Sequence, residues 1–292
     1  MGWLVTGARG MLGTDLCRVL TRHGISVTAA DRGDLDLFDQ DAVGEAVSAH
    51  DVVVNCAAWT AVDDAETAEE RAYDINTIAP GVLSRAAAHH GRRIVQVSTD
   101  YVFDGTARSP YDEDAPTDPA SSYGRTKAAG EAVVRAAAPE QHLVVRTAWL
   151  YGAHGACFPR TIARLAGERA SVSGASVSVV DDQVGQPTWT VDVAELIVRL
   201  VQTEVPAGTW HATSTGQTTW FEFARLVVER AGLSTDLVSP TDSASFVRPA
   251  PRPAYSVLGH DKLRLHGIEP IGPWDERWAA AASEVLGLEQ AQ

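Results

Sequence analysis

Short apolar runs rich in β-branched residues alternate with longer amphipathic stretches through the first half of this chain. Each run has the length of one buried strand, and each intervening stretch has the periodicity of a helix. Regular alternation of this kind builds βαβ units, whose right-handed crossovers place helices on both faces of a parallel sheet. We therefore predict an α/β fold with a doubly wound parallel sheet, whose strands are 3–6, 27–30, 52–56, 94–98 and 143–146.

A glycine-rich loop follows the first strand directly and opens the first helix, with the sequence Thr6-Gly7-Ala8-Arg9-Gly10-Met11-Leu12-Gly13. Gly7 and Gly10 allow a tight turn and the close approach of a pyrophosphate. That group would sit at the helix N-terminus, where free N–H groups and the helix dipole favour negative charge. Gly13 lets helix and strand pack closely. The place of this loop between strand and helix predicts a Rossmann-like dinucleotide site.

The end of the second strand bears on the identity of the dinucleotide. Asp31 stands where a carboxylate would accept hydrogen bonds from the adenosine ribose. Arg9 and Arg32 are placed to bind a 2′-phosphate instead. We therefore expect NADPH or NADH as cofactor, and the residues leave the choice between them open.

The character of the sequence changes after about residue 150, where elements become shorter and a proline-rich stretch covers 240–253. We expect a dinucleotide-binding domain over 1–150 and mainly a smaller C-terminal substrate-binding domain over 151–292. A strand pattern at 176–180 and a helix at about 191–202 suggest that part of 176–205 returns to the main sheet.

Tyr123 and Lys127 carry the clearest catalytic pattern, since a spacing of four puts both side chains on one face of a helix. Hydride reduction of a ketone leaves an alkoxide that must receive a proton, and a nearby ammonium lowers the pKa of a tyrosine that donates it. Thr99 follows the strand 94–98, at the sheet edge where α/β proteins bind ligands. Its hydroxyl can stabilise charge on the same oxygen, so the three residues indicate carbonyl reduction.

Composition argues against several other classes of protein. A formal net charge of -14 repels polyanions, so we expect no nucleic-acid partner. The apolar runs fall far short of the roughly 20 residues that a membrane helix needs, and the N-terminus enters a strand without a leader-like segment. The three cysteines form no paired motif and the nine histidines no zinc pattern. We expect a cytoplasmic protein with no membrane span and no metal.

The glycine spacing and three later segments resemble the extended short-chain dehydrogenase/reductase superfamily. Asp34-Leu35-Asp36-Leu37 resembles its segment over adenine, Asn55-Cys56-Ala57-Ala58 resembles its strand end, and Asn76 matches an asparagine near its cofactor. The resemblance and the patterns above together give as expected cofactor-binding residues Gly7, Arg9, Gly10, Met11, Leu12, Gly13, Asp31, Arg32, Asp36, Leu37, Ala57, Ala58, Thr60, Asn76, Tyr123 and Lys127.

A narrower resemblance, to the dTDP-4-dehydrorhamnose reductase family, covers nearly the whole chain. The segments that carry it are 55–63, 98–105, 123–127, 180–188 and 252–256. It implies NAD(P)H-dependent reduction of the 4-keto group of a dTDP-4-keto-6-deoxyhexose, with dTDP-4-dehydro-L-rhamnose as the expected substrate. It also implies that Thr99, Tyr123 and Lys127 form the catalytic triad.

The same resemblance suggests where the nucleotide sugar binds. Thr99, Asp100 and Trp149 match residues that contact the sugar. Arg252 is expected to contact the diphosphate, because a guanidinium binds phosphate oxygens at two points and this acidic protein offers few other donors there.

Some members of that family use a magnesium ion that bridges a dimer through glutamates. Asp15 stands where one such glutamate would be, but Thr190 and Val191 occupy the region of another. This departure argues against a magnesium-linked dimer, and we expect a monomer or a homodimer.

Two other functions stay open. A nucleotide-sugar 4,6-dehydratase or epimerase shares this scaffold, but in dehydratases a glutamate follows the Thr-Asp pair, where this chain has Tyr101. The regulatory subunit of methionine adenosyltransferase keeps the fold and much of the Tyr/Lys motif without being an enzyme. Its relatives tend to have serine at the position of Thr99, so both differences favour a reductase, for 4-keto-L-rhamnose or a related deoxysugar.

Overall fold

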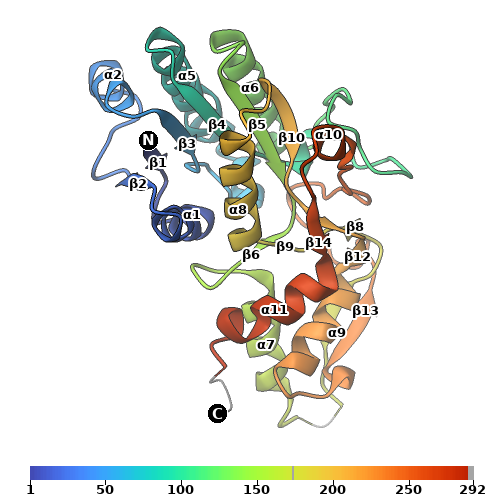
Figure 1. The fold of residues 1–292 in the computed structure, drawn as a ribbon. Helices are drawn as coiled ribbons and strands as arrows, with labels where there is room; N and C mark the ends of the chain where they lie inside the picture. Colours follow the sequence, from blue (N-terminus) through green and yellow to red (C-terminus); the bar gives the residue numbers. More distant parts are fainter. Residues whose placement is uncertain (173, 289–292) are drawn as a thin grey trace.

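A six-stranded parallel sheet forms the centre of the computed structural model, which describes residues 1–172 and 174–288 (Figure 1). Its strand order is β10-β5-β4-β3-β1-β2, and every neighbouring pair runs parallel. This confirms the predicted doubly wound fold. The strands are β1 (Gly2–Thr6), β2 (Ser26–Ala30), β3 (Val52–Asn55), β4 (Arg93–Thr99), β5 (His142–Thr147) and β10 (Gly208–His211).

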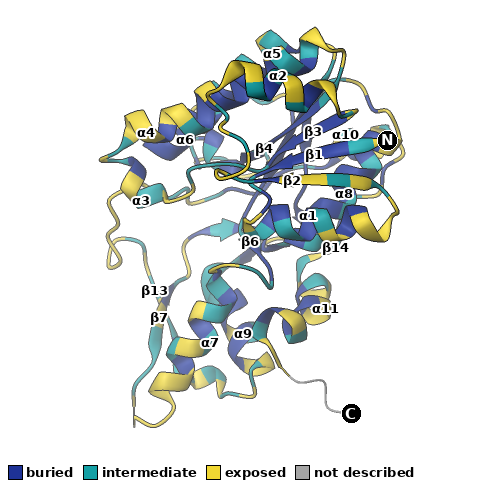
Figure 2. Cartoon of the chain, turned by 90° about the vertical axis from the view of Figure 1, so that its left-hand side faces the viewer, coloured by how far each residue is buried: buried dark blue, intermediate teal, exposed yellow. Residues whose placement is uncertain are grey.

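Helices cover both faces of this sheet and bury its inner strands between them, whereas the edge strand β2 is largely exposed (Figure 2). One face packs against α1 (Met11–Arg22) and α8 (Thr190–Gln202), and the other against α2 (Gln40–Ser48), α5 (Ala79–His89) and α6 (Ser122–Ala137). Two apolar clusters result, one on each side of the sheet. Strand β3 reads Val-Val-Val-Asn and is buried along its whole length, as expected for a central parallel strand.

A second lobe lies below the sheet in Figure 1 and has its own apolar cluster. Its helices are α7 (Phe158–Arg169), α9 (Trp220–Arg230) and α11 (Trp274–Leu286). Four two-stranded pairs complete it and join it to the sheet: β6 (Leu150–Tyr151) with β9 (Thr188–Trp189), β7 (Val177–Val180) with β13 (Val238–Thr241), β8 (Val184–Gly185) with β12 (Thr218–Thr219), and β11 (Ser214–Thr215) with β14 (Ile271–Pro273).

Segments from the second half of the chain return to the main sheet, though not all those expected. Helix α8 packs on α1, and β10 adds the outer strand next to β5. The expectation for 176–180 is wrong, because β7 pairs with β13 in the second lobe. An apolar alternation shows that a strand exists but does not say which sheet receives it. The last four residues of the predicted C-terminal domain lie outside the described residues.

Short helical turns connect the larger elements and include one π-helical turn. They are α3 (Val62–Ala65), α4 (Glu69–Tyr73), the π-turn η1 (Asp74–Ile78), η2 (Asp100–Val102), η3 (Thr235–Leu237) and α10 (Asp261–Leu265). Within the ranges given above, no helix is long and apolar enough to cross a membrane.

Candidate active site

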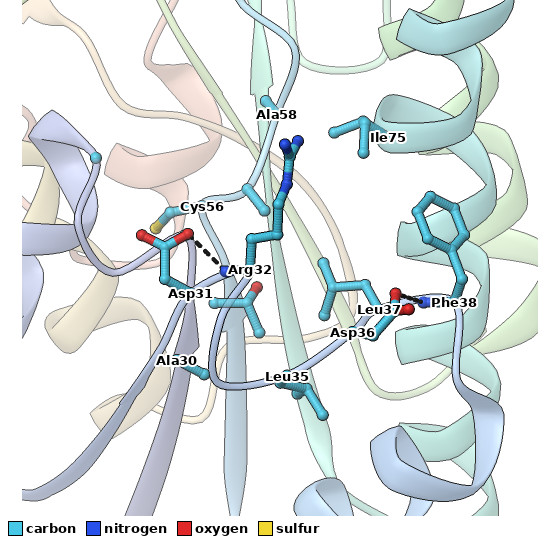
Figure 3. A pocket seen from close by; sticks show the side chains of 14 residues that line it. Ala30, Asp31, Arg32, Leu35, Asp36, Leu37, Phe38, Cys56, Ala58 and Ile75 are labelled. Atoms are coloured by element: carbon cyan, nitrogen blue, oxygen red, sulfur yellow. Dashed lines mark hydrogen bonds between the residues drawn. The ribbon is translucent and has the colours of Figure 1, made fainter.

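A cavity of about 530 Å³ opens at the carboxyl ends of β1, β2 and β3. It lies where the strand order reverses, between β1 and β3, which is the place where open α/β sheets bind ligands. Figure 3 shows its lining side chains. The lining residues are Thr6, Gly7, Gly10, Ala30, Asp31, Arg32, Leu35, Asp36, Leu37, Phe38, Cys56, Ala57, Ala58 and Ile75.

The glycine loop forms the floor of this cavity and fits a dinucleotide. Gly7 has φ of 65°, and a Cβ there would lie 2.5 Å from the backbone nitrogen of Ala57. Gly10 caps α1 without a side-chain acceptor, and the first turn of α1 holds no acidic residue. The free N–H groups of that turn are therefore available to a diphosphate, as the sequence predicted.

Of the charged residues expected near the adenosine ribose, Asp31 and Arg32 line the cavity and Arg9 does not. The Asp31 carboxylate accepts a hydrogen bond from the backbone N–H of Arg32 at 2.7 Å. In Figure 3 the Arg32 side chain extends toward Ala58 and Ile75. Arg9 instead forms an exposed ion pair with Asp34 at 3.6 Å. Arg32 is therefore the better placed of the two arginines to meet a phosphate in the cavity.

Asn55, the first residue of the Asn-Cys-Ala-Ala segment, forms hydrogen bonds at the end of β3. Its side-chain oxygen accepts hydrogen bonds from the Thr6 hydroxyl at 2.7 Å and from the backbone N–H of Ala57 at 3.1 Å. Its amide donates to Gln96 at 2.8 Å. One buried side chain thus ties β1, β3 and β4 together at the edge where the ligand would bind, and it fixes the start of the loop that carries Ala57 and Ala58.

Asn76 lies in the π-turn η1 and is buried rather than facing the cavity. Its side chain accepts from the backbone N–H of Trp59 at 2.9 Å, and donates to the Trp59 carbonyl at 3.2 Å and to the Thr126 hydroxyl at 3.0 Å. The main chain of Asn76 also packs tightly on α6, since a Cβ at Gly130 would overlap its carbonyl oxygen. Asn76 therefore joins the loop after β3 to the helix that carries Tyr123.

Thr99, Asp100, Tyr123 and Lys127 gather around β4, the strand next to β3, and all four are buried. Thr99 ends β4 and donates a hydrogen bond to the Asp100 carboxylate at 2.9 Å. Tyr123 and Lys127 lie on the first two turns of α6, whose N-terminus is capped by the Ser121 hydroxyl. The Lys127 ammonium donates to the carbonyl oxygen of Val97 in β4 at 2.7 Å. The predicted helix face and strand end therefore meet.

Burial is the main cause of the pKa shifts of Asp100, Tyr123 and Lys127. It raises the pKa of the Tyr123 phenol, and the Thr99 hydroxyl acts in the opposite direction. It raises the pKa of Asp100 to about 6, opposed by the hydroxyls of Ser256 and Thr99. It lowers the pKa of Lys127 to about 8, opposed by the negative charge of Glu131. Tyr123 is thus held as a protonated phenol, and the expectation that Lys127 lowers its pKa is wrong for this structure, because burial dominates and the Lys127 ammonium donates to Val97 instead.

Trp149 and Arg252 flank the catalytic group. Trp149 follows β5, two residues beyond Thr147, which pairs in register with Thr99. The Arg252 guanidinium lies 6.0 Å from the Tyr101 ring centre, and Tyr101 packs edge-on against Tyr123 at 5.6 Å.

Arg252 also forms an ion pair with Asp63 at 2.9 Å, and Arg248 approaches the same carboxylate at 3.6 Å. Asp63, from α3, is therefore the carboxylate that holds both arginines.

Half of the predicted cofactor residues line the cavity, and half lie around it. Those that line it are Gly7, Gly10, Asp31, Arg32, Asp36, Leu37, Ala57 and Ala58. Those outside its lining are Arg9, Met11, Leu12, Gly13, Thr60, Asn76, Tyr123 and Lys127. Cavity residues that were not predicted to bind the cofactor are Thr6, Ala30, Leu35, Phe38, Cys56 and Ile75, most of which adjoin predicted positions along the chain.

Asp15 and Thr190, the two positions that the magnesium comparison singled out, contact each other. The Thr190 hydroxyl donates a hydrogen bond to the buried Asp15 carboxylate. Across residues 1–172 and 174–288, no three histidine, cysteine, aspartate or glutamate side chains group as metal ligands.

The chain is similar to known proteins along nearly its whole length. The profile of the family described as RmlD substrate binding domain matches residues 1–286. A dTDP-4-dehydrorhamnose reductase of Streptomyces griseus is 46% identical over 288 residues, 97% of this chain and 92% of that protein. A dTDP-4-keto-6-deoxy-D-glucose reductase of Streptomyces niveus is 45% identical over 274 residues, 93% of each chain.

Solved structures agree with the sequence comparisons. The structure of a dTDP-4-dehydrorhamnose reductase from Bacillus anthracis in complex with NADP superposes with a TM-score of 0.90 at 35% identity. The match covers 96% of this chain and 98% of that one. Both lobes of the chain are therefore similar to those of this nucleotide-binding relative.

Proposed function

Because this chain belongs to the RmlD substrate binding domain family, we propose that it reduces the 4-keto group of a dTDP-4-keto-6-deoxyhexose. The expected reaction converts dTDP-4-dehydro-L-rhamnose to dTDP-L-rhamnose. The observation that carries the proposal is the meeting of Thr99 and Tyr123 beside a cavity built on a glycine loop. That arrangement joins a dinucleotide site to a carbonyl-binding site.

Bound along the glycine loop, a reduced nicotinamide nucleotide would supply the hydride that the ketone carbon accepts. NADPH is the preferred form, supported by the relative that binds NADP and by the placement of Arg32, with NADH as the alternative. Gly7 and Gly10 would admit the diphosphate, and Asp31 would face the adenosine ribose.

Tyr123, Thr99 and Lys127 have different roles in the reduction of the ketone. Tyr123 donates its phenolic proton to that oxygen as negative charge develops on it. Thr99 donates a hydrogen bond to the same oxygen from the end of β4. Lys127, with a pKa of about 8, is mostly an ammonium at neutral pH and would hold the nicotinamide ribose. Asp100 and Trp149 would contact the sugar, and Arg252 the diphosphate.

A related 4-keto sugar is the second candidate substrate, since the Streptomyces niveus relative is named for dTDP-4-keto-6-deoxy-D-glucose. Dehydration finds less support, because Tyr101 stands where a dehydratase has glutamate, and burial raises the pKa of its phenol. We propose the cytoplasm as the compartment, because Cys17, Cys56 and Cys157 are all free thiols.

The proposal is tested by following NADPH and NADH oxidation with dTDP-4-keto-L-rhamnose generated in the assay. Oxidation that yields dTDP-L-rhamnose supports the reductase and gives its cofactor preference. Y123F should lose nearly all turnover while it binds NADPH as the native protein does. Tight nucleotide binding without oxidation of any dTDP-4-keto sugar would favour the regulatory-subunit function.

A further inference from the structure

Trp149 adopts a backbone conformation that bulky residues rarely take. Its φ is 47°, and within residues 1–172 and 174–288 only one other non-glycine residue has a positive φ. A non-glycine residue in the left-handed region is strained and persists only where its surroundings hold it. Trp149 follows Thr147 by two residues, and Thr147 pairs with Thr99 at the end of β4, so the strained residue lies close along the chain to the proposed substrate site.

Trp220 holds one face of the Trp149 indole. The two rings stack with centres 3.6 Å apart and planes 7° from parallel. Trp220 is the first residue of α9, and Phe158 of α7 packs against it at 4.4 Å. The stacking partner of Trp149 is therefore anchored in the core of the second lobe.

Gly185 covers the other face of the same indole. A Cβ at Gly185 would lie 2.6 Å from both Cζ2 and Nε1 of Trp149, and closer still to Cε2, the atom between them. This near-equal spacing places Gly185 over the ring rather than at its edge. Since Trp220 occupies one face, the indole lies between the two residues.

The segment 183–188, which belongs to the resemblance but carries no catalytic residue, builds this enclosure. The Thr188 backbone N–H donates to the Trp149 carbonyl at 3.2 Å. The Gln186 amide donates to the carbonyl of Ser214 at 2.9 Å, and its oxygen accepts from the Leu258 N–H at 2.8 Å. Gly185 pairs with Thr218 of β12, the short strand that leads into α9.

From these contacts we infer that Trp220, with Gly185 opposite it, is a positioning residue that fixes Trp149 against the sugar of the substrate. The inference rests on the proposed function, because it takes the nucleotide sugar as the ligand of Trp149. Because Trp220 and Gly185 cover its two faces, the Trp149 indole presents only its edge to the sugar, at one fixed angle, so less ordering is needed when the sugar binds.

The experiment compares W220L, W220F and W274L with the native protein. Trp274 packs on the same apolar cluster as Trp220 but meets Phe223 edge-on, so W274L controls for lost core packing. We expect W220L to raise KM for the dTDP-4-keto sugar about tenfold or more, while Kd for NADPH changes less than about twofold. W220F should recover most of the native KM, and W274L should keep it despite a lower Tm.

Near-UV circular dichroism reports directly on the stacking of Trp149 and Trp220. W220L should remove the near-UV circular dichroism of the stacked indoles, and W274L should retain it. The inference is overturned if W220L keeps the native KM, or if W274L raises KM as much as W220L does.

Failure of the proposed function gives a different result. If the native protein reduces no dTDP-4-keto sugar, calorimetric binding of dTDP-L-rhamnose replaces KM as the readout. Weaker binding by W220L than by W274L would then support the positioning role on its own, and equal binding would overturn it.

Discussion

The carboxylate of Glu131 accepts hydrogen bonds from two nitrogens of the Arg146 guanidinium, at 2.9 and 2.8 Å, and both side chains are buried. The Ser98 hydroxyl adds a third hydrogen bond to Glu131 at 2.6 Å. Glu131 belongs to α6, the helix of Tyr123, while Arg146 and Ser98 belong to β5 and β4. These hydrogen bonds therefore hold α6, and with it Tyr123, against β4 and β5.

E131Q should destabilise the protein by about 3–5 kcal/mol, because it leaves the Arg146 cation buried without its counter-charge. Urea unfolding at neutral pH measures this change. E168Q is the control, since Glu168 forms an exposed ion pair with Arg164 and such pairs contribute about 0–1 kcal/mol. Similar losses of unfolding free energy in E131Q and E168Q would mean that water solvates the ion pair between Glu131 and Arg146.

G13A and G44A should change stability in opposite directions, although both replace a glycine inside a helix. A Cβ at Gly13 in α1 would overlap the carbonyl oxygen of Gly7, whereas a Cβ at Gly44 in α2 meets nothing within 4 Å. G44A should stabilise the protein by roughly 0.5–1 kcal/mol, the helix preference of alanine over glycine.

G13A should lower Tm and weaken NADPH binding together, because the clash displaces the loop that would hold the diphosphate. Thermal melts and fluorescence titration with NADPH report the two effects. Native NADPH affinity in a folded G13A protein would contradict the proposed role of this loop.

Local patterns predicted the sheet and the positions of the chemistry, because both depend on short-range features. Strand alternation predicted five of the six strands of the sheet, all but β10, and the spacing of Tyr123 and Lys127 predicted the helix face that meets Thr99. Contacts between distant segments were not predictable. Glu131 and Arg146 look like surface charges in the sequence, and nothing local shows that they will be buried against each other.

Asn76 shows the same limit at the cofactor site. Its resemblance to an asparagine near the cofactor was visible in the sequence, but its contact with Thr126 joins residues 50 positions apart. The fold alone brings η1 against α6. The enclosure of Trp149 likewise depends on the pairing of β8 with β12, which no alternation of residues specifies.

Asp100 should make the protein less stable above pH 6 than a neutral isostere at the same position. The folded-state pKa of Asp100 is raised from 3.8 to about 6 by burial. Below pH 4 this carboxyl is protonated in both states. Between pH 4 and 6 it ionises first in the unfolded chain, so folding loses stability as pH rises.

D100N removes this cost and keeps an acceptor for Thr99. The variant should gain up to about 3 kcal/mol over the native protein at pH 8, since two pKa units correspond to about 2.7 kcal/mol, and the gain should vanish near pH 4. Urea unfolding at pH 4, 6 and 8 tests this, with the low-pH value as the control. A difference that stays constant with pH would show that Asp100 ionises alike in both states.

R32Q should discriminate between the two nicotinamide nucleotides. Arg32 lines the cavity, so its guanidinium is placed to meet a 2′-phosphate, whereas Arg9 is occupied by Asp34. We expect R32Q to raise KM for NADPH about tenfold and to leave KM for NADH within about twofold. R9Q is the matched control and should change the NADPH value much less. Equal losses for both nucleotides in R32Q would mean that Arg32 shapes the cavity without recognising the phosphate, and an unchanged NADPH value would remove Arg32 from the site.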